Sequence, residues 1–280
     1  MHPLIGTAAL AAMLESDEPP TLLDVRWRLA GPPGKDSYTA AHLPCALFLD
    51  LDTELAGEPG EGGRHPLPDP DELQKHLRGA GVRSAHPVVV YDDVDGSVAA
   101  RAWWLLRWAG HAEVAVLDGG FAAWIEERRP VTADVPEPAL GDIVVDPGHL
   151  PVLDADDAER SARAGVLLDA RAPERYAGAV EPVDPRAGHI PGAVNAPFAE
   201  HLGADRRWRS PSELAARFAE LGVTPGTPVG AYCGSGVTAS SVVLALEVAG
   251  VGEPPALYAG SWSHWSRDPQ RPAATGDQPG

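Results

Sequence analysis

Short apolar runs alternate along this chain with segments whose apolar residues recur at helical spacing. Residues 228–232 predict a buried strand, and residues 237–248 predict a helix that places valines and leucines against a core. Residues 88–92 predict another buried strand, and segments 71–77 and 211–221 predict helices that open with proline or acidic residues. Short apolar strands alternating with helices indicate an α/β fold, with a parallel sheet covered by helices on both faces.

The chain contains an internal repeat. Five pairs of short segments recur in the same order, separated by 141 to 147 residues. The pairs are 23–26 with 168–171, 41–44 with 188–191, 81–82 with 222–223, 88–92 with 228–233, and 117–124 with 258–265. The repeat predicts two domains of one fold, residues 1–128 and 147–280, and the proline-rich segment 129–146 predicts a semi-extended linker. The tail 267–280, rich in proline and glycine, is expected to be loosely held.

Cys233 lies between the predicted strand 228–232 and the predicted helix 237–248. A loop that leaves a strand and enters a helix start turns several backbone N–H groups toward one point, and the helix dipole adds to their effect. The N–H groups of Gly234, Gly236, Val237 and Thr238 would stabilise a thiolate, which is the nucleophilic form of cysteine. The alternative is an inert core cysteine, which would need neither glycine. We therefore interpret Cys233 as a nucleophile.

Bulk composition narrows the class of protein. At 280 residues the chain is long enough for two domains with separate cores. A formal charge of −18 argues against nucleic acid or an anionic membrane as a partner, so an anionic substrate would need local arginines. Two cysteines cannot form a disulfide framework, which indicates a reducing compartment and a cytoplasmic location. The apolar segment 4–14 runs into acidic residues and predicts an amphipathic helix rather than a signal peptide.

These motifs resemble the tandem-domain rhodanese-like sulfurtransferases over nearly the whole chain. The Asp-x-Arg strand ends, the Gly-His-Ile-Pro-Gly-Ala block at 188–193, the Cys233 loop and the Gly-Ser-Trp block at 260–262 occur in that family's order. The loop Cys-Gly-Ser-Gly-Val-Thr is similar to that of 3-mercaptopyruvate sulfurtransferases, since thiosulfate-specific rhodaneses usually carry basic residues after the cysteine. The resemblance implies two rhodanese-like domains, of which only the C-terminal one is catalytic. Asp92 stands at the nucleophile position of the N-terminal domain, and Cys45, opposite Gly192, is interpreted as a packing cysteine.

The resemblance also implies roles for the site residues. Cys233 would accept sulfur as a persulfide, with no metal and no cofactor. Ser235 would relay a proton to His65, a histidine contributed by the N-terminal domain, and Asp52 would orient that histidine. Taken alone, Ser235 could equally be a loop serine bonded to backbone, and His65 is one of ten histidines.

Arginines are the candidate ligands for an anionic donor. Arg175 matches the family's substrate-binding arginine, whose guanidinium grips a carboxylate or sulfonate bidentately; the alternative is a surface salt bridge. The family's second arginine, which follows a Glu-Pro pair, is missing after 181–182, and the next arginine is Arg186. Arg186 is the candidate to fill that place, and without it the preference for mercaptopyruvate would weaken. The Asp-x-Arg pairs are expected to be structural, and His189 is expected to anchor its turn.

The predicted activity is transfer of a sulfane sulfur from 3-mercaptopyruvate, through a Cys233 persulfide, to cyanide or a thiol. Thioredoxin is a candidate protein acceptor. A thiosulfate:cyanide sulfurtransferase is the nearest alternative, and a non-enzymatic sulfur carrier or sensor is a third. The joint presence of Ser235, His65 and Arg175 argues against the carrier. Cysteine phosphatases and arsenate reductases share the fold class but need Cys-x5-Arg, and Ala239 stands where that arginine would be.

Overall fold

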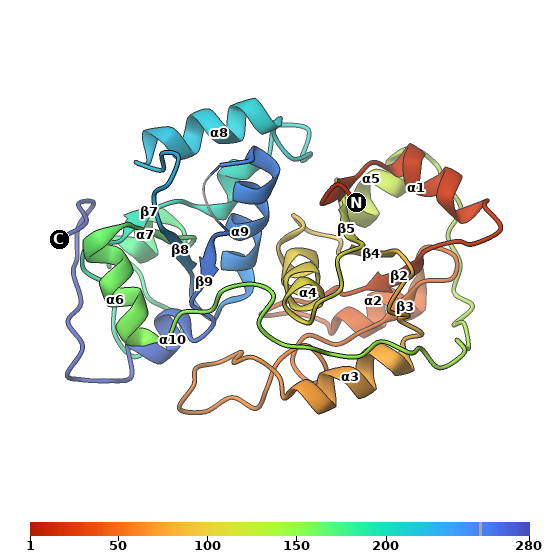
Figure 1. Cartoon of the computed structure of the whole chain (residues 1–280), viewed down its shortest axis with the longest axis horizontal. Helices are drawn as coiled ribbons and strands as arrows, with labels where there is room; N and C mark the ends of the chain where they lie inside the picture. The colour runs from red at the N-terminus through yellow and green to blue at the C-terminus, as the bar shows by residue number, and fades with distance from the viewer. Residues whose placement is uncertain (252–253) are drawn as a thin grey trace. The chain divides into compact units, whose positions relative to one another are not determined.

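The computed structural model describes residues 1–251 and 254–280, and these residues form two compact units (Figure 1). The first unit comprises Met1–Gly57 and Pro68–His149, and the second unit comprises Glu58–Leu67 and Leu150–Gly280. The short segment Glu58–Leu67 therefore packs with the second unit, although the internal repeat places it in the first domain. The domain boundaries drawn from the sequence, at residues 128 and 147, stay predictions.

The first unit is a parallel sheet of five strands in the order β1-β5-β4-β2-β3. Its strands are β1 (Leu4–Ile5), β2 (Thr21–Asp24), β3 (Leu47–Phe48), β4 (Val88–Tyr91) and β5 (Val114–Leu117). Its helices are α1 (Thr7–Leu14), α2 (Gly34–Ala40), α3 (Pro70–Gly79), α4 (Ser97–Trp108) and α5 (Gly120–Glu126). The register pairs Asp24 with Tyr91, so the carboxyl ends of β2 and β4 meet at one edge of the sheet.

The second unit repeats this plan with four parallel strands in the order β7-β6-β8-β9. Its strands are β6 (Val166–Asp169), β7 (Val194–Asn195), β8 (Val229–Tyr232) and β9 (Ala256–Leu257). Its helices are α6 (Ala155–Ala164), α7 (Pro173–Tyr176), the 3-10 helix η1 (Phe198–His201), α8 (Pro211–Glu220), α9 (Val237–Ala249) and α10 (Ser261–Trp265). Asp169 pairs with Tyr232, as Asp24 pairs with Tyr91 in the first unit.

Both sheets are buried between helices. In the first unit, Leu10 of α1 and Trp124 of α5 belong to the apolar cluster on one sheet face. In the second unit, Ala158 of α6 and Trp262 of α10 occupy the equivalent positions. Figure 1 shows α6 and α9 on opposite sides of strands β8 and β9. The predicted α/β fold, with a helix-covered parallel sheet in each half, is confirmed.

Capping residues explain where several helices begin. The Asp69 carboxylate accepts the N–H groups of the first turn of α3, and Ser210 forms a capping box with Glu213 at the start of α8. The helix predicted over 4–14 begins later, at Thr7, because Leu4–Ile5 pairs with β5. None of the helices in the described residues is long and apolar enough to cross a membrane.

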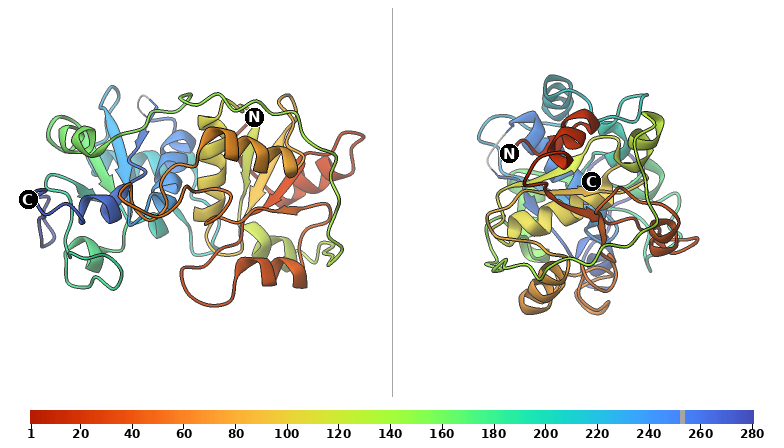
Figure 2. Two further views of the ribbon diagram at one scale, coloured as in Figure 1. Left: turned by 90° about the horizontal axis from the view of Figure 1, so that it is seen from below. Right: turned by 90° about the vertical axis from the view of Figure 1, so that its right-hand side faces the viewer.

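Residues 129–149 contain no helix or strand and run along the first unit (Figure 2). Backbone hydrogen bonds join Thr132 to His42 in both directions at 2.9 Å, and the Gly141 N–H donates to the carbonyl of Arg78 at 2.8 Å. This semi-extended segment is therefore held against the body of the first unit.

The C-terminal tail 267–280 is held to the second unit, contrary to the expectation of a loose tail. Ala274 pairs with His189 in an antiparallel bridge. The His189 ring stacks on Tyr176, and its Nδ1 lies 2.8 Å from the Tyr176 carbonyl oxygen. The tail and the turn of His189 therefore support each other, and the predicted anchoring role of His189 fits this geometry.

Candidate active site

Cys233 lies in the turn between β8 and α9, and its side chain is 2% exposed. Gly236 caps α9 with a φ of 82°, and a Cβ there would lie 2.4 Å from the carbonyl oxygen of Ala259, so only glycine fits. This tight turn directs the Gly236 N–H to the Cys233 Sγ at 3.1 Å. The start of α9 adds a positive dipole end at the same place. The further N–H donors expected from the sequence, those of Gly234, Val237 and Thr238, stay predictions.

The equivalent turn of the first unit shows what such a loop can hold. Asp92 follows β4 as Cys233 follows β8, and its carboxylate is buried. Four backbone N–H groups donate to it: Val94 and Gly96 to Oδ1 at 3.0 Å, Val98 to Oδ2 at 3.1 Å, and Ala99 to Oδ2 at 3.0 Å. In this fold, the turn from a strand into a helix start therefore binds an anion through backbone N–H groups.

Replacing Asp92 by asparagine should change how stability depends on pH. Burial, and then the nearby Asp95, raises the pKa of Asp92 to about 6 from 3.8, although N–H groups of the loop lower it. The folded state then holds the proton more tightly than the unfolded state, so this group destabilises the fold above about pH 6 and less so toward about pH 4. The free energy of unfolding of wild type minus that of Asp92→Asn should therefore grow by about 2.4 kcal/mol between about pH 7 and about pH 4. Urea unfolding of both proteins measures it. A difference that shrinks on acidification would show that the four N–H donors outweigh burial.

The start of α10 holds the Cys233 loop in place. The Cys233 N–H donates to Ser261 Oγ at 3.1 Å, and the Trp262 N–H donates to the Cys233 carbonyl at 2.9 Å. The Ser263 N–H donates to the Gly234 carbonyl at 2.8 Å. The sequence marked the Gly-Ser-Trp block at 260–262 as part of the repeat and of the family resemblance, but not that its serine and the following Ser263 support the loop.

Ser235 and His65 form a buried pair in the second unit. His65 Nδ1 lies 2.7 Å from Ser235 Oγ, and the two side chains are 4% and 8% exposed. Ser235 comes from the Cys233 loop and His65 from the segment Glu58–Leu67, so the pair joins two stretches far apart in the sequence. A hydroxyl within hydrogen-bond distance of an imidazole can pass a proton to it.

Close backbone packing attaches the segment Glu58–Leu67 to the second unit. A Cβ on Gly63 would lie 2.7 Å from the carbonyl oxygen of Gly260, and the φ of Gly63 is 111°. The Arg64 N–H donates to Ser263 Oγ at 3.0 Å, and Arg267 donates to the Gly60 carbonyl. Ser263 thus contacts both this segment and the cysteine loop, which fixes His65 beside Ser235.

Asp52 belongs to the first unit, where its Oδ2 accepts a hydrogen bond from Trp27 Nε1 at 2.8 Å. The predicted orientation of His65 by Asp52 stays a prediction.

Two guanidinium groups lie against the cysteine loop. A Cβ on Gly234 would lie 3.4 Å from Arg175 Nη1, and the predicted binding of substrate by Arg175 stays a prediction. It would lie 3.2 Å from Nη2 of Arg64, a residue that sequence reasoning overlooked. Its place in the sequence could have indicated it, because Arg64 directly precedes His65, which was predicted to lie beside the cysteine loop.

The Arg186 guanidinium forms hydrogen bonds within the protein and is not free to bind substrate. It donates to the four carbonyl groups of Trp265, Ser266, Asp268 and Arg271, at 2.8 to 3.0 Å. These bonds tie the end of α10 to the tail and occupy both terminal nitrogens and Nε. The structure therefore corrects the expectation that Arg186 supplies the second substrate-binding cation.

The Asp-x-Arg pairs form buried ion pairs at the carboxyl ends of β2 and β6. Arg171 Nη2 donates to Asp169 Oδ2 at 2.6 Å and to the carbonyl of Gly188 at 2.7 Å, and both side chains are buried. Arg26 and Asp24 repeat this pair in the first unit at the same distance. A buried charge needs such a partner, so these pairs are structural, as the sequence predicts.

Cys45 lies in the first unit and its thiol is exposed, so its interpretation as a packing cysteine is wrong. Its φ is 66°, and that of Gly192 is 86°. The shared left-handed backbone supports the alignment of these two positions in the repeat.

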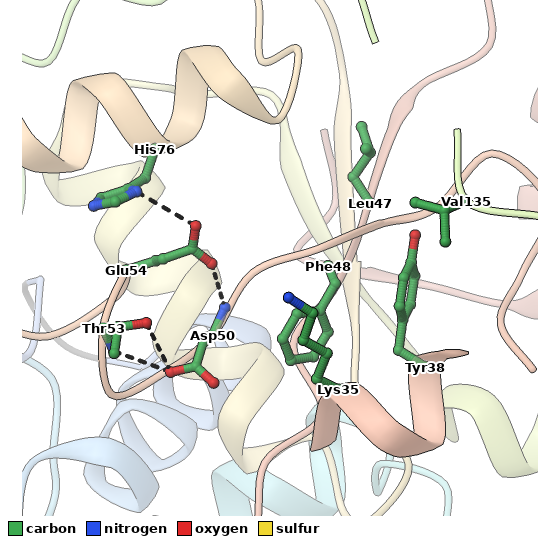
Figure 3. Close-up of a pocket in the computed structure, with 9 residues that line it drawn as sticks. All are labelled: Lys35, Tyr38, Leu47, Phe48, Asp50, Thr53, Glu54, His76 and Val135. Atoms are coloured by element: carbon green, nitrogen blue, oxygen red, sulfur yellow. Dashed lines mark hydrogen bonds and ion pairs between the residues drawn. The ribbon is translucent and has the colours of Figure 1, made fainter. Parts of the chain in front are cut away.

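A pocket of about 520 Å³ in the first unit is a separate feature (Figure 3). His76 of α3 points toward Glu54, with 3.4 Å between Nδ1 and Oε1. The pocket is lined by Lys35, Tyr38, Leu47, Phe48, Asp50, Thr53, Glu54, His76 and Val135. This lining offers no thiol. Across residues 1–251 and 254–280, no group of three or more His, Cys, Asp or Glu side chains is placed to hold a metal ion.

Comparisons with known proteins cover both units. The profile of the rhodanese-like domain matches residues 7–127 and 154–268. The chain is 46% identical over 286 residues to a probable 3-mercaptopyruvate sulfurtransferase of Pseudomonas aeruginosa, covering 98% of each chain. It is 44% identical over 277 residues to a putative thiosulfate sulfurtransferase, SseB, of Mycobacterium tuberculosis, covering 98% of this chain and 97% of the relative.

Solved structures agree with the sequence comparisons. A 3-mercaptopyruvate sulfurtransferase from Leishmania major superposes with a TM-score of 0.82 at 28% identity, over 94% of this chain and 74% of that one. SseA from Escherichia coli superposes with a TM-score of 0.81 at 29% identity, over 94% of this chain and 100% of that one.

Proposed function

The chain belongs to the tandem rhodanese-like sulfurtransferases, and from this premise we propose that it transfers sulfur from 3-mercaptopyruvate to a thiophilic acceptor through a persulfide on Cys233. The observation that carries the proposal is the 2.7 Å contact between Ser235 Oγ, on the cysteine loop, and His65 Nδ1. A donor that is itself a thiol needs a proton moved during the reaction, and this pair provides a route for it.

In the first step, the Cys233 thiolate attacks the sulfur of mercaptopyruvate. The new S–S bond forms as the C–S bond breaks, and the electron pair of that bond leaves as the enolate of pyruvate. The donor's thiol proton is lost and the enolate carbon gains a proton, so His65 and Ser235 act as the relay. The Gly236 N–H stabilises the anionic sulfur before the attack.

In the second step, a nucleophile such as cyanide attacks the outer sulfur of the persulfide. The S–S bond breaks, thiocyanate leaves, and the Cys233 thiolate is restored. The Asp92 loop supports this scheme, because its backbone N–H groups surround a negatively charged side chain at the position that corresponds to Cys233. A thiol acceptor would work in the same way, and thioredoxin stays a predicted acceptor.

Thiosulfate is the second candidate donor. The relative from Mycobacterium tuberculosis is named a putative thiosulfate sulfurtransferase, and two guanidinium groups beside Gly234 could attract its sulfonate. Thiosulfate carries no thiol proton, however, so the buried pair of Ser235 and His65 would have no task in its reaction.

We expect a higher kcat/KM for 3-mercaptopyruvate than for thiosulfate, with cyanide as the common acceptor. The measurement is thiocyanate formation with each donor on one preparation of the protein. Thiosulfate as the better donor by about tenfold or more would overturn the choice of donor. The absence of turnover with either would favour a sulfur carrier or sensor instead.

A further inference from the structure

Arg64 and Arg175 belong to different segments of the chain, and their guanidinium groups lie against the same residue of the cysteine loop, Gly234. Their Nη2 and Nη1 atoms lie 3.2 Å and 3.4 Å from the place where a Cβ on Gly234 would stand. Gly234 directly follows Cys233, so both guanidinium groups lie against the residue next to the nucleophile. The absence of a side chain at Gly234 leaves this space to the two arginines.

Two carboxylates accept hydrogen bonds from these guanidinium groups. Arg64 Nη1 donates to Asp184 Oδ1 at 2.7 Å, and Arg175 Nη2 donates to Asp184 Oδ2 at 3.1 Å. Arg175 Nη2 also donates to Glu181 Oε1 at 2.7 Å. Asp184 thus bridges the arginines, and its side chain is only 3% exposed. The bridge fixes the spacing of the two cations.

Three guanidinium nitrogens of Arg64 and Arg175 have no acceptor within the described part of the chain. Arg64 Nε is buried without a hydrogen-bond partner there, and Arg64 Nη2 and Arg175 Nη1 donate to no described residue. Buried N–H groups in folded proteins are nearly always paired, so the unpaired Arg64 Nε indicates a place for an acceptor from outside. The two terminal nitrogens belong to side chains that are 22% and 21% exposed, so a ligand can reach them.

We propose that Arg64 and Arg175 together bind the carboxylate of an α-keto acid donor, with Asp184 as the positioning residue that sets their spacing. This inference rests on the proposed function and names the substrate group that the site holds. Arg64 replaces the arginine missing after Glu181 and does what the sequence assigned to Arg186.

The charges of the cluster fit a monoanion. Two arginines and the two carboxylates of Glu181 and Asp184 carry no formal net charge, so the site offers directed hydrogen bonds rather than an excess of cation. A planar carboxylate can accept two N–H groups from a pair of guanidinium edges. Because Arg64 directly precedes His65, one docked segment places both the carboxylate ligand and the proton relay.

The test is a set of substitutions assayed with two donors. We expect Arg64→Gln to raise the KM for 3-mercaptopyruvate by about 10- to 100-fold, with kcat changed by less than about threefold, since a hydrogen bond to a charged group is lost. Arg64→Lys keeps the positive charge but lacks the planar guanidinium, so its KM should lie between those of the wild type and Arg64→Gln. Asp184→Asn should raise KM by a smaller factor. Arg160→Gln, at an exposed arginine paired with Asp157 on α6, is the matched control and should leave KM unchanged.

The second donor separates binding of the carboxylate from damage to the loop. Mercaptoacetone has a methyl group where mercaptopyruvate has its carboxylate, so Arg64→Gln should not lower its kcat/KM further. An unchanged KM for mercaptopyruvate in Arg64→Gln and Arg64→Lys would overturn the proposal, and so would an equal loss with both donors. In either case, persulfide formation on Cys233 at saturating mercaptopyruvate, detected by intact mass, would show that the proposed function stands. A wild-type protein that forms no persulfide would overturn the proposed function itself, and the carboxylate site with it.

Discussion

Cys233→Ser should abolish sulfur transfer while leaving the fold intact. Serine is nearly isosteric with cysteine, and its hydroxyl can accept the same Gly236 N–H that now lies 3.1 Å from the sulfur. The hydrogen bonds that hold the loop to α10 involve the backbone of Cys233 and are unaffected. A hydroxyl is far less acidic than a thiol and cannot form a persulfide, so the covalent route is lost.

Intact-mass spectrometry after incubation with donor measures this directly. The wild type should gain one sulfur atom at Cys233, and Cys233→Ser should gain none. The exposed Cys45 supplies the matched control, because Cys45→Ser should retain full activity and the full mass increase. Sulfur found on Cys45, or turnover retained by Cys233→Ser, would contradict the assignment of the nucleophile.

His65→Ala should lower kcat/KM for 3-mercaptopyruvate by about 10²- to 10⁴-fold, or roughly 3–5 kcal/mol in barrier, which is the usual contribution of a general acid–base group. Mercaptopyruvate must lose a thiol proton while its enolate carbon gains one, and the contact of His65 with Ser235 provides the path. Thiosulfate has no such proton, so any activity with it should fall by less than about tenfold. Steady-state kinetics with both donors test this difference.

Ser235→Ala should show the same dependence on donor, since it removes the other half of the relay. His149→Ala is the control, because that histidine is exposed and pairs only with the neighbouring Asp146 among the described residues. Equal losses with both donors would mean that His65 shapes the loop without moving a proton. Full activity in His65→Ala would remove it from the mechanism.

Features that depend on local order along the chain could be predicted from the amino-acid sequence. The strand 228–232, the glycines after Cys233 and the helix beginning at Val237 are contiguous, so the turn that presents the thiol to Gly236 follows from residues next to one another. The parallel sheets follow for the same reason, since alternating apolar runs and helices permit few other folds. The internal repeat also matched Asp92 to Cys233, and the structure puts both residues at the same kind of turn.

The distant side chains that lie against the cysteine loop could not be predicted in this way, because their positions depend on tertiary contacts. The Arg64 guanidinium lies beside Gly234, whereas the Arg186 guanidinium donates to four carbonyl groups near the C-terminus. The docking of Glu58–Leu67 on the second unit depends on backbone contacts of Gly63 with Gly260, which have no counterpart in composition or periodicity. Hydrophobic periodicity predicts which face of a helix or strand is buried. It does not predict where the loop between two such elements lies. That position follows from close approach and hydrogen bonding between residues about 200 apart, as between Arg64 and Ser263.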